Sequence, residues 1–129
     1  MAIIKSFREL DVYQLVLQES KKILIITRGF PKEEKYSLTD QIRRSSRAVN
    51  ALIAESWARR LYQAAFVNKI SEALGEAMET QAWLDHALNY DYISVAQHRE
   101  LDDAWQHAGA MLNRMIQQAH TFCKPISGK

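Results

Sequence analysis

The sequence predicts an all-α fold, an antiparallel up-down-up-down four-helix bundle, and three observations support this prediction. Apolar residues recur close to every 3.6 positions, and no segment alternates apolar and polar side chains as a half-buried strand does. Only two prolines and four glycines interrupt the 129 residues. The long periodic segments are joined by short connections, which is typical of antiparallel neighbouring helices. We expect one domain covering residues 1–129.

The first helix is expected at about residues 12–28. Asp11 can cap its N-terminus, and Gln14 stands three residues further on, as in a capping box. Gly29 is a suitable residue for the position after the last turn, and Pro31 prevents the helix from continuing.

The remaining helices are expected at about residues 38–60, 63–88 and 95–120. Ser37 is the predicted cap of the second helix, and Ser94 with Gln97 forms a capping box before the fourth. Each helix carries one apolar stripe, as a bundle requires. On the second helix the stripe contains Leu38, Ile42, Val49, Ile53 and Ser56. On the third it contains Phe66, Ile70, Ala73, Ala77, Leu84 and Leu88. On the fourth it contains Leu101, Trp105, Ala108, Leu112, Met115 and Ala119.

Two features exceed the needs of a monomeric bundle. The apolar arc of the first helix is about twice the minimum width of ~100°, and it includes Tyr13, Leu17 and Leu24. Trp83 lies on the charged side of the third helix, one turn after Glu79. It either lies along the rim of the bundle or belongs to a subunit interface, where aromatic residues are enriched. We therefore take Trp83, Leu17, Leu24 and Tyr13 as candidate residues of an oligomer interface.

The composition is that of a soluble globular protein, with 47% hydrophobic and 25% charged residues. The single Cys123 fits a reducing compartment. No apolar run is long enough to span a bilayer and no signal-peptide pattern precedes the first helix, so we expect a cytoplasmic protein. The net charge of +2 is unevenly spread. Residues 1–60 hold 12 Lys and Arg against 7 Asp and Glu, whereas residues 61–129 hold 5 against 8.

The sequence contains no recognisable catalytic or metal-binding motif. His98 and Asp102 are four residues apart and can meet on one helix face, but one such pair is not a metal site. Glu72, Glu76 and Glu79 form an acidic row, for which a solvated or salt-bridging face is the favoured interpretation. Cys123 has no evident base beside it. We therefore predict a protein without enzymatic activity, metal or cofactor.

The second helix carries a cluster of like charge. On a helical wheel Arg43, Arg44 and Arg47 fall within about 100°, opposite the apolar stripe. Further basic residues extend the charge at both ends of the helix: Lys32, Lys35, Arg59 and Arg60. Two interpretations remain open. The arginines pair with the acidic row within or between subunits, or they bind phosphate, whose oxygens match the guanidinium fork.

The chain also resembles a known bacterial family. The segments that carry the resemblance are "FRELDVYQ", "FPKEEKYSLTDQIRRSSRAV", "IAES" and "AAFVNKISEALGEAMETQAWLDHAL". They are similar to the four-helix-bundle proteins encoded in intervening sequences of large-subunit ribosomal RNA genes, with more distant relatives among the accessory proteins of diversity-generating retroelements. The chain departs from the family pattern at Leu52, where asparagine is usual, and at Asn50 and Ser56.

The resemblance implies a homopentameric ring of four-helix bundles with a basic surface for nucleic acid and no known enzymatic activity. By analogy with the distant relatives, a reverse transcriptase is a further candidate partner. We therefore predict a non-enzymatic homo-oligomer that binds RNA or DNA through its phosphate backbone, using Arg43, Arg44 and Arg47. The outer contacts are expected from Arg59, Arg60, Lys32 and Lys35. The alternative is a structural or protein-interaction module whose arginines form ion pairs within or between subunits.

Overall fold

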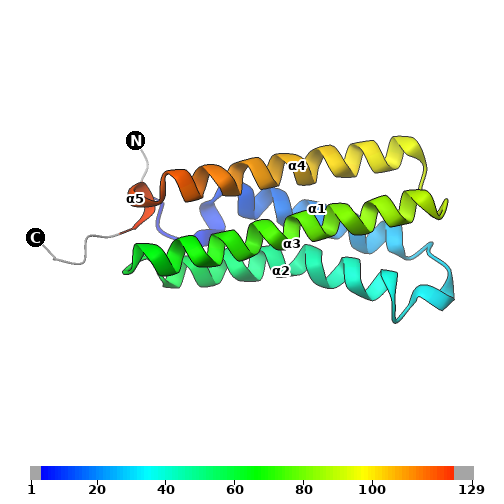
Figure 1. Ribbon diagram of the computed structural model, residues 1–129, viewed down its shortest axis with the longest axis horizontal. Coiled ribbons are helices and arrows are strands. Elements are labelled where there is room, and N and C mark those ends of the chain that lie inside the picture. The colour runs from blue at the N-terminus through cyan, green and yellow to red at the C-terminus, as the bar shows by residue number, and fades with distance from the viewer. Residues whose placement is uncertain (1–3, 124–129) are drawn as a thin grey trace, which may run out of the picture.

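Four long helices lie side by side and form a four-helix bundle, as predicted (Figure 1). The computed structural model describes residues 4–123, so residues 1–3 and 124–129 of the predicted domain lie outside the described part. The long helices are α1 (Asp11–Thr27), α2 (Leu38–Ala58), α3 (Gln63–Asn89) and α4 (Val95–Gln117). The shorter ones are η1 (Phe7–Glu9), η2 (Lys32–Glu34) and α5 (Ala119–Phe122).

Consecutive helices are neighbours in the bundle, and α4 also packs against α1. Helices α2 and α4 are therefore diagonal to one another. The helix bounds agree with the predicted ones to within three residues. The predicted fourth helix is divided at Gln118, whose backbone leaves the helical region with φ −110° and ψ 29°, and α5 continues after it.

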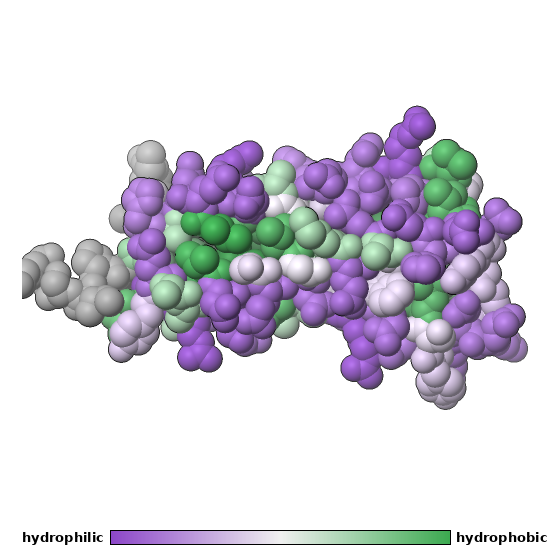
Figure 2. Space-filling model, viewed as in Figure 1, coloured by the Kyte–Doolittle hydropathy of each residue, from purple (hydrophilic) through white to green (hydrophobic). Residues whose placement is uncertain are grey.

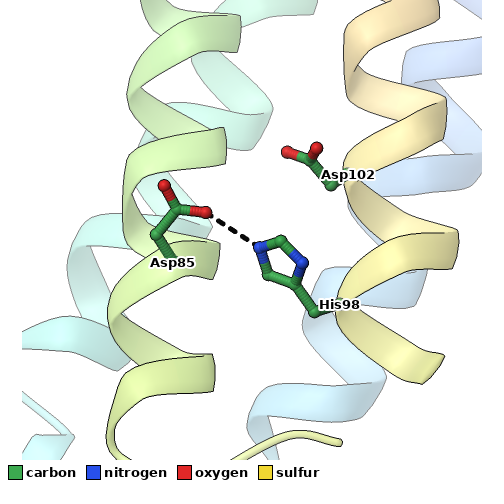
Figure 3. A group of neighbouring side chains, drawn as sticks. All are labelled: Asp85, His98 and Asp102. Atoms are coloured by element: carbon green, nitrogen blue, oxygen red, sulfur yellow. Dashed lines mark hydrogen bonds and ion pairs between the residues drawn. The ribbon is translucent and has the colours of Figure 1, made fainter. Parts of the chain in front are cut away.

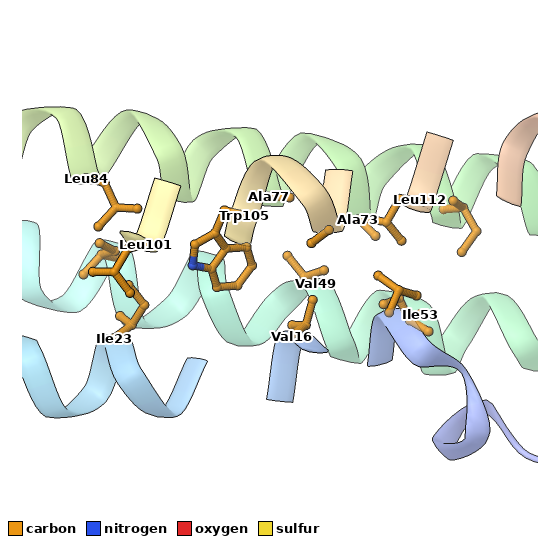
Figure 4. Close-up of a cluster of buried hydrophobic side chains, with 14 of the residues drawn as sticks. Val16, Ile23, Val49, Ile53, Ala73, Ala77, Leu84, Leu101, Trp105 and Leu112 are labelled. Carbon is orange, nitrogen blue, oxygen red and sulfur yellow. The ribbon is translucent and has the colours of Figure 1, made fainter. Parts of the chain in front are cut away.

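The predicted apolar stripes form the core (Figure 4). Every predicted stripe residue of α2 and of the fourth segment is buried, and Trp105 is completely enclosed. On α3 only Leu88 departs from the prediction, because it is half-buried at the end of the helix. Ala73 and Ala77 of α3 face the core of the bundle, and their small side chains allow neighbouring helices to approach closely.

A buried polar contact joins α2 and α3, and periodicity did not predict it. The hydroxyl oxygens of Ser45 and Thr80 lie 2.8 Å apart, and both side chains are almost completely buried. Thr80 Oγ1 also donates to the carbonyl of Glu76 in its own helix. Each hydroxyl therefore has a partner, which removes most of the cost of burying it.

The predicted cap of α1 is wrong. The capping position belongs to Leu10, which has no polar side chain, and Asp11 is the first residue of the helix. Gln14 does not complete a capping box, because its Nε2 donates to the carbonyl of Arg8 at 2.8 Å. The preceding 3-10 turn η1 places this carbonyl beside Gln14, an arrangement that a local sequence pattern does not reveal.

The other two predicted caps have different outcomes. Ser37 occupies the capping position of α2, but its side chain makes no capping hydrogen bond. Glu34 acts instead, because its Oε1 accepts from the backbone N–H of Leu38 at 3.2 Å. The capping box of Ser94 and Gln97 before α4 is confirmed in both of its hydrogen bonds.

Candidate functional site

A groove of about 340 Å³ lies between α1 and α2. Its α1 side is formed by Leu17, Ser20, Lys21 and Leu24, and its α2 side by Arg43, Ser46, Arg47 and Asn50. Leu17 and Leu24 are 47% and 39% exposed, so apolar surface faces solvent here. The groove therefore combines an apolar wall with three cationic side chains.

The two arginines of the groove are held by their Nε atoms. Arg43 is half-buried, and its Nε donates to Thr27 Oγ1 at 2.8 Å. Arg47 is exposed, and its Nε donates to the carbonyl oxygen of Arg43 at 3.0 Å. Neither guanidinium forms an ion pair with a carboxylate of residues 4–123. Their terminal nitrogens are thus available to an external anion.

The third arginine of the cluster is separate from the groove. Arg44 Nε pairs with Asp40 Oδ2 at 2.8 Å, and the Arg44 side chain is largely in solvent whereas that of Asp40 is partly buried. The wheel placed all three arginines opposite the core, but Arg43 lies along α1 instead. The flank of α2 that meets α1 is about 100° from the core stripe, so a residue on that flank becomes partly covered.

Asn50 lies at one end of the groove and is 8% exposed. Its Nδ2 donates to the carbonyl of Tyr13 at 3.1 Å, which ties α2 to α1. Its buried Oδ1 has no hydrogen-bond partner among residues 4–123. One of the departures from the family pattern is therefore a structural link that also brings an amide to the groove.

The remaining predicted basic residues are more dispersed. Lys32 and Lys35 are exposed in and beside η2, near the start of α2. Arg59 is exposed at the other end of α2, about 24 Å along the axis from Arg43 at ~1.5 Å per residue. Arg60 is half-buried, with its Cζ 3.8 Å from the centre of the Trp57 ring. The structure therefore brings Arg43 and Arg47 together but places Arg59 and Arg60 far from them.

The acidic row of α3 does not meet the arginines of the groove within one chain. Lys69 lies between Glu55 and Glu72, at 3.3 and 3.6 Å. Glu79 accepts a hydrogen bond from Trp83 Nε1 at 3.3 Å. Burial, together with the charge of Glu79, raises the pKa of Glu76. An ion pair between this row and Arg43 or Arg47 would therefore require a second chain.

The candidate interface residues occupy two sides of the bundle. Tyr13 is half-buried against Phe7, whereas Leu17 and Leu24 face the groove. Trp83 is half-buried on α3 and packs beside His86, with ring centres 5.7 Å apart. Within one chain the indole lies partly exposed beside His86, a position that is compatible with both interpretations.

A second partly apolar surface was not predicted from the sequence. Figure 2 shows an apolar strip over α3 between hydrophilic flanks. Leu74 and Met78 of α3 and Gly109 and Ala110 of α4 line a hollow of about 380 Å³ together with three polar residues, Gln81, Gln106 and Asn113. Met78 is 59% exposed. The signal was present in the sequence, because Leu74 and Met78 are four apart on one helix face.

Cys123 gives no sign of an activated nucleophile. Burial raises the pKa of the Cys123 thiol, and the charge of Arg60 opposes this only in part. A thiol rather than a thiolate is therefore favoured at neutral pH.

None of the helices in residues 4–123 combines the length and apolar character needed to cross a bilayer.

Together, the fold and the groove define a small four-helix-bundle protein with a cationic, partly apolar surface between its first two helices. The chain belongs to the 23S rRNA-intervening sequence protein family, whose family model matches residues 8–114. This confirms the resemblance found in the sequence. No protein of curated function matches the chain.

A solved structure supports the same assignment. It is a protein of unknown function from the S23 ribosomal protein family of Bacteroides thetaiotaomicron VPI-5482. The two chains share 26% sequence identity and superpose with a TM-score of 0.74. The match covers 83% of this chain and 96% of the other, so the similarity extends over nearly the whole bundle.

Proposed function

We propose that the protein is a non-enzymatic, homo-oligomeric nucleic-acid-binding protein that holds phosphate groups in the α1–α2 groove. The observation that supports this proposal is how the Arg43 and Arg47 side chains are held and paired. Both stems are fixed by Nε hydrogen bonds, and neither guanidinium has a carboxylate partner among the described residues. Fixed guanidinium groups lose less conformational entropy when they bind, and their forks match phosphate oxygens.

RNA is the first nucleic acid to test. The family description refers to ribosomal RNA intervening sequences, and the solved neighbour is assigned to a ribosomal protein family. Recognition through phosphates positions a nucleic acid without reading its sequence. We therefore expect weak sequence preference and binding that weakens steeply as salt increases.

The experiment measures fluorescence anisotropy of a labelled, structured RNA at about 50 and about 200 mM salt, a range over which phosphate contacts lose affinity strongly. The variant is Arg43→Ala with Arg47→Ala. We expect at least tenfold weaker binding and a salt dependence reduced by about two phosphate contacts. A single-stranded DNA of the same length shows whether the 2′-hydroxyl contributes.

The matched control is Arg99→Ala with Arg114→Ala. Both residues are exposed on α4, diagonal to α2, so this variant has the same change in net charge on another side of the bundle. We expect it to bind nearly as well as the wild type. No binding at either salt, or equal losses in the two double variants, would overturn the proposal.

A second candidate function is supported by the apolar wall of the groove. Phosphate does not require Leu17 and Leu24, whereas a protein partner would bury them. In this alternative the protein is a structural or interaction module, and Arg43 and Arg47 pair with acidic side chains of a neighbouring subunit. Its signature would be association that persists in the absence of nucleic acid together with no RNA binding.

A further inference from the structure

Three side chains that bind metals in other proteins converge between α3 and α4 (Figure 3). Asp85 comes from α3, whereas His98 and Asp102 lie one turn apart on α4. One nitrogen or oxygen atom from each residue lies within 4.8 Å of the other two. His98 Nε2 is already 2.8 Å from Asp85 Oδ1.

The neighbouring side chains hold this cluster in place. Gln81 Nε2 donates to Asp102 Oδ1 at 3.1 Å and also contacts Gln106 Oε1 at 3.1 Å. These bonds orient the Asp102 carboxylate and leave its second oxygen without a hydrogen-bond partner among the described residues. Hydrogen bonds of this kind from surrounding side chains position metal ligands and tune their basicity.

The cluster contains more acidic than basic groups. Two carboxylates face one imidazole, and Asp102 forms no ion pair with lysine or arginine in residues 4–123. The side chain of His98 is only 18% exposed, so it is partly screened from water, whereas that of Asp85 is 71% exposed and free to adjust. A divalent cation would neutralise both carboxylates at once.

We propose that Asp85, His98 and Asp102 bind a divalent transition-metal ion, with Zn²⁺ as the best fit. An imidazole with two carboxylates suits Zn²⁺, whereas Mg²⁺ and Ca²⁺ prefer oxygen ligands alone. Ligands about 2.0–2.2 Å from a tetrahedral Zn²⁺ lie roughly 3.3 Å from one another. The three ligand atoms lie within 4.8 Å of one another, so rotations of both the Asp85 and the Asp102 side chains are needed to reach this spacing.

A metal ligand is the neutral imidazole with Nε2 unprotonated. The proton that lies between His98 Nε2 and Asp85 Oδ1 therefore moves to Nδ1 if the ring is neutral, and is released to solvent if the ring carries both protons. Three protein ligands leave the fourth tetrahedral position to water. The ion would join α3 to α4 close to the turn that connects them. The sequence predicted no metal here, because His98 and Asp102 alone are too few and Asp85 is contributed by another helix.

The experiment titrates the full chain with ZnCl₂ by calorimetry and with CoCl₂ by visible absorption, which reports tetrahedral coordination. All proteins carry Cys123→Ser, which removes the one thiol that could bind these metals. We expect one ion per chain and a Co²⁺ ligand-field band. His98→Ala should weaken binding at least tenfold, and the isosteric Asp102→Asn should weaken it several-fold.

His107→Ala is the matched control, because His107 is an exposed histidine on the same helix, outside the cluster. It should bind as tightly as the parent, and MgCl₂ should give no saturable signal at the same concentrations. Circular dichroism confirms that each variant is folded. Absence of saturable Zn²⁺ binding, or equal weakening in the His98 and His107 variants, would overturn the proposal.

Discussion

The carboxylate of Glu34 joins two connections at the same end of the bundle. Its Oε2 accepts from the Tyr92 hydroxyl at 2.8 Å, and its Oε1 accepts from the Leu38 backbone N–H. Phe30 lies beside Tyr92, with ring centres 5.3 Å apart. The "FPKEE" segment, which begins one of the stretches that carry the family resemblance, thus links the α1–α2 connection to the α3–α4 turn.

The hydrogen bond between Tyr92 and Glu34 should make the stability of the bundle depend on pH. The hydrogen bond from Tyr92, followed by that from Leu38, lowers the pKa of Glu34. The same bond to Glu34 raises the pKa of Tyr92 to about 12. The Tyr92–Glu34 hydrogen bond therefore contributes to the free energy of unfolding at pH values above the unfolded pKa of Glu34, near 4.5. This contribution is lost as pH falls through the lower folded pKa. On the alkaline side it is lost as pH rises from 10 to about 12.

We expect Tyr92→Phe to lower the melting temperature by a few degrees at pH 7, because it removes this bond. The difference from the wild type should shrink below about pH 4. Thermal unfolding followed by circular dichroism measures both effects. Tyr36→Phe is the control, because Tyr36 is 86% exposed and its hydroxyl has no hydrogen bond among the described residues. A melting-temperature difference that stays constant at acidic pH would contradict a stabilising hydrogen bond between Tyr92 and Glu34.

Arg43 and Arg47 of the candidate site were predicted from the sequence, but Lys21 and the groove that contains all three residues were not. A helical wheel describes directions around one axis, and it correctly grouped Arg43 with Arg47. The facing wall comes from α1, and Thr27 receives Arg43 only because two helices pack in one particular register. Asp85 was missed for the same reason, since its partners lie on a different helix.

Helix α3 ends in a Schellman motif with aspartate where glycine is usual. Asp91 has a φ of 62°, in the left-handed region. Its N–H donates to the carbonyl of Leu88, and the N–H of Tyr92 donates to that of Ala87. These bonds satisfy two carbonyl groups at the end of the helix.

Glycine adopts this conformation without steric cost. We expect Asp91→Gly to stabilise the bundle by about 0.5–1 kcal/mol, which urea unfolding can measure. Asp103→Gly removes the same charge from an exposed position inside α4, and it should instead destabilise by a few tenths of a kcal/mol, because glycine is a slightly poorer helix former than aspartate. Stabilities that fall together in both variants would show that the end of α3 gains nothing from glycine.

At the scale of the element, helix positions were easier to predict than the chemistry of their ends. The apolar stripes repeat along each helix, so many residues together indicate which face is buried. Almost every predicted core residue is in fact buried. A cap depends on one or two side chains and on the preceding backbone. The turn η1 displaced Asp11 from the capping position, and Glu34 replaced Ser37 as the partner of the first turn of α2.

Two of the partly apolar surfaces formed by residues 4–123 differ in charge. The α1–α2 groove carries Lys21, Arg43 and Arg47, whereas the strip over α3 lies on the helix that also carries the acidic row. Different patches that complement one another favour head-to-tail contacts, which close into rings when the rotation permits. The charge imbalance between the two halves of the sequence is consistent with such an assembly.

Light scattering on the purified chain tests this arrangement without any ligand. We expect a solution mass of several chains, each of 14.9 kDa, rather than of one. Leu17→Ser with Leu24→Ser should shift the mass toward the monomer, because it removes apolar area that a neighbour would cover while leaving the arginines in place. Leu61→Ser with Val95→Ser is the control, since both residues are at least half exposed but lie outside the groove. A monomeric wild type would contradict the interface assigned to Leu17 and Leu24. In that case the groove would remain open to solvent, and RNA binding by Arg43 and Arg47 would have to occur on a single bundle.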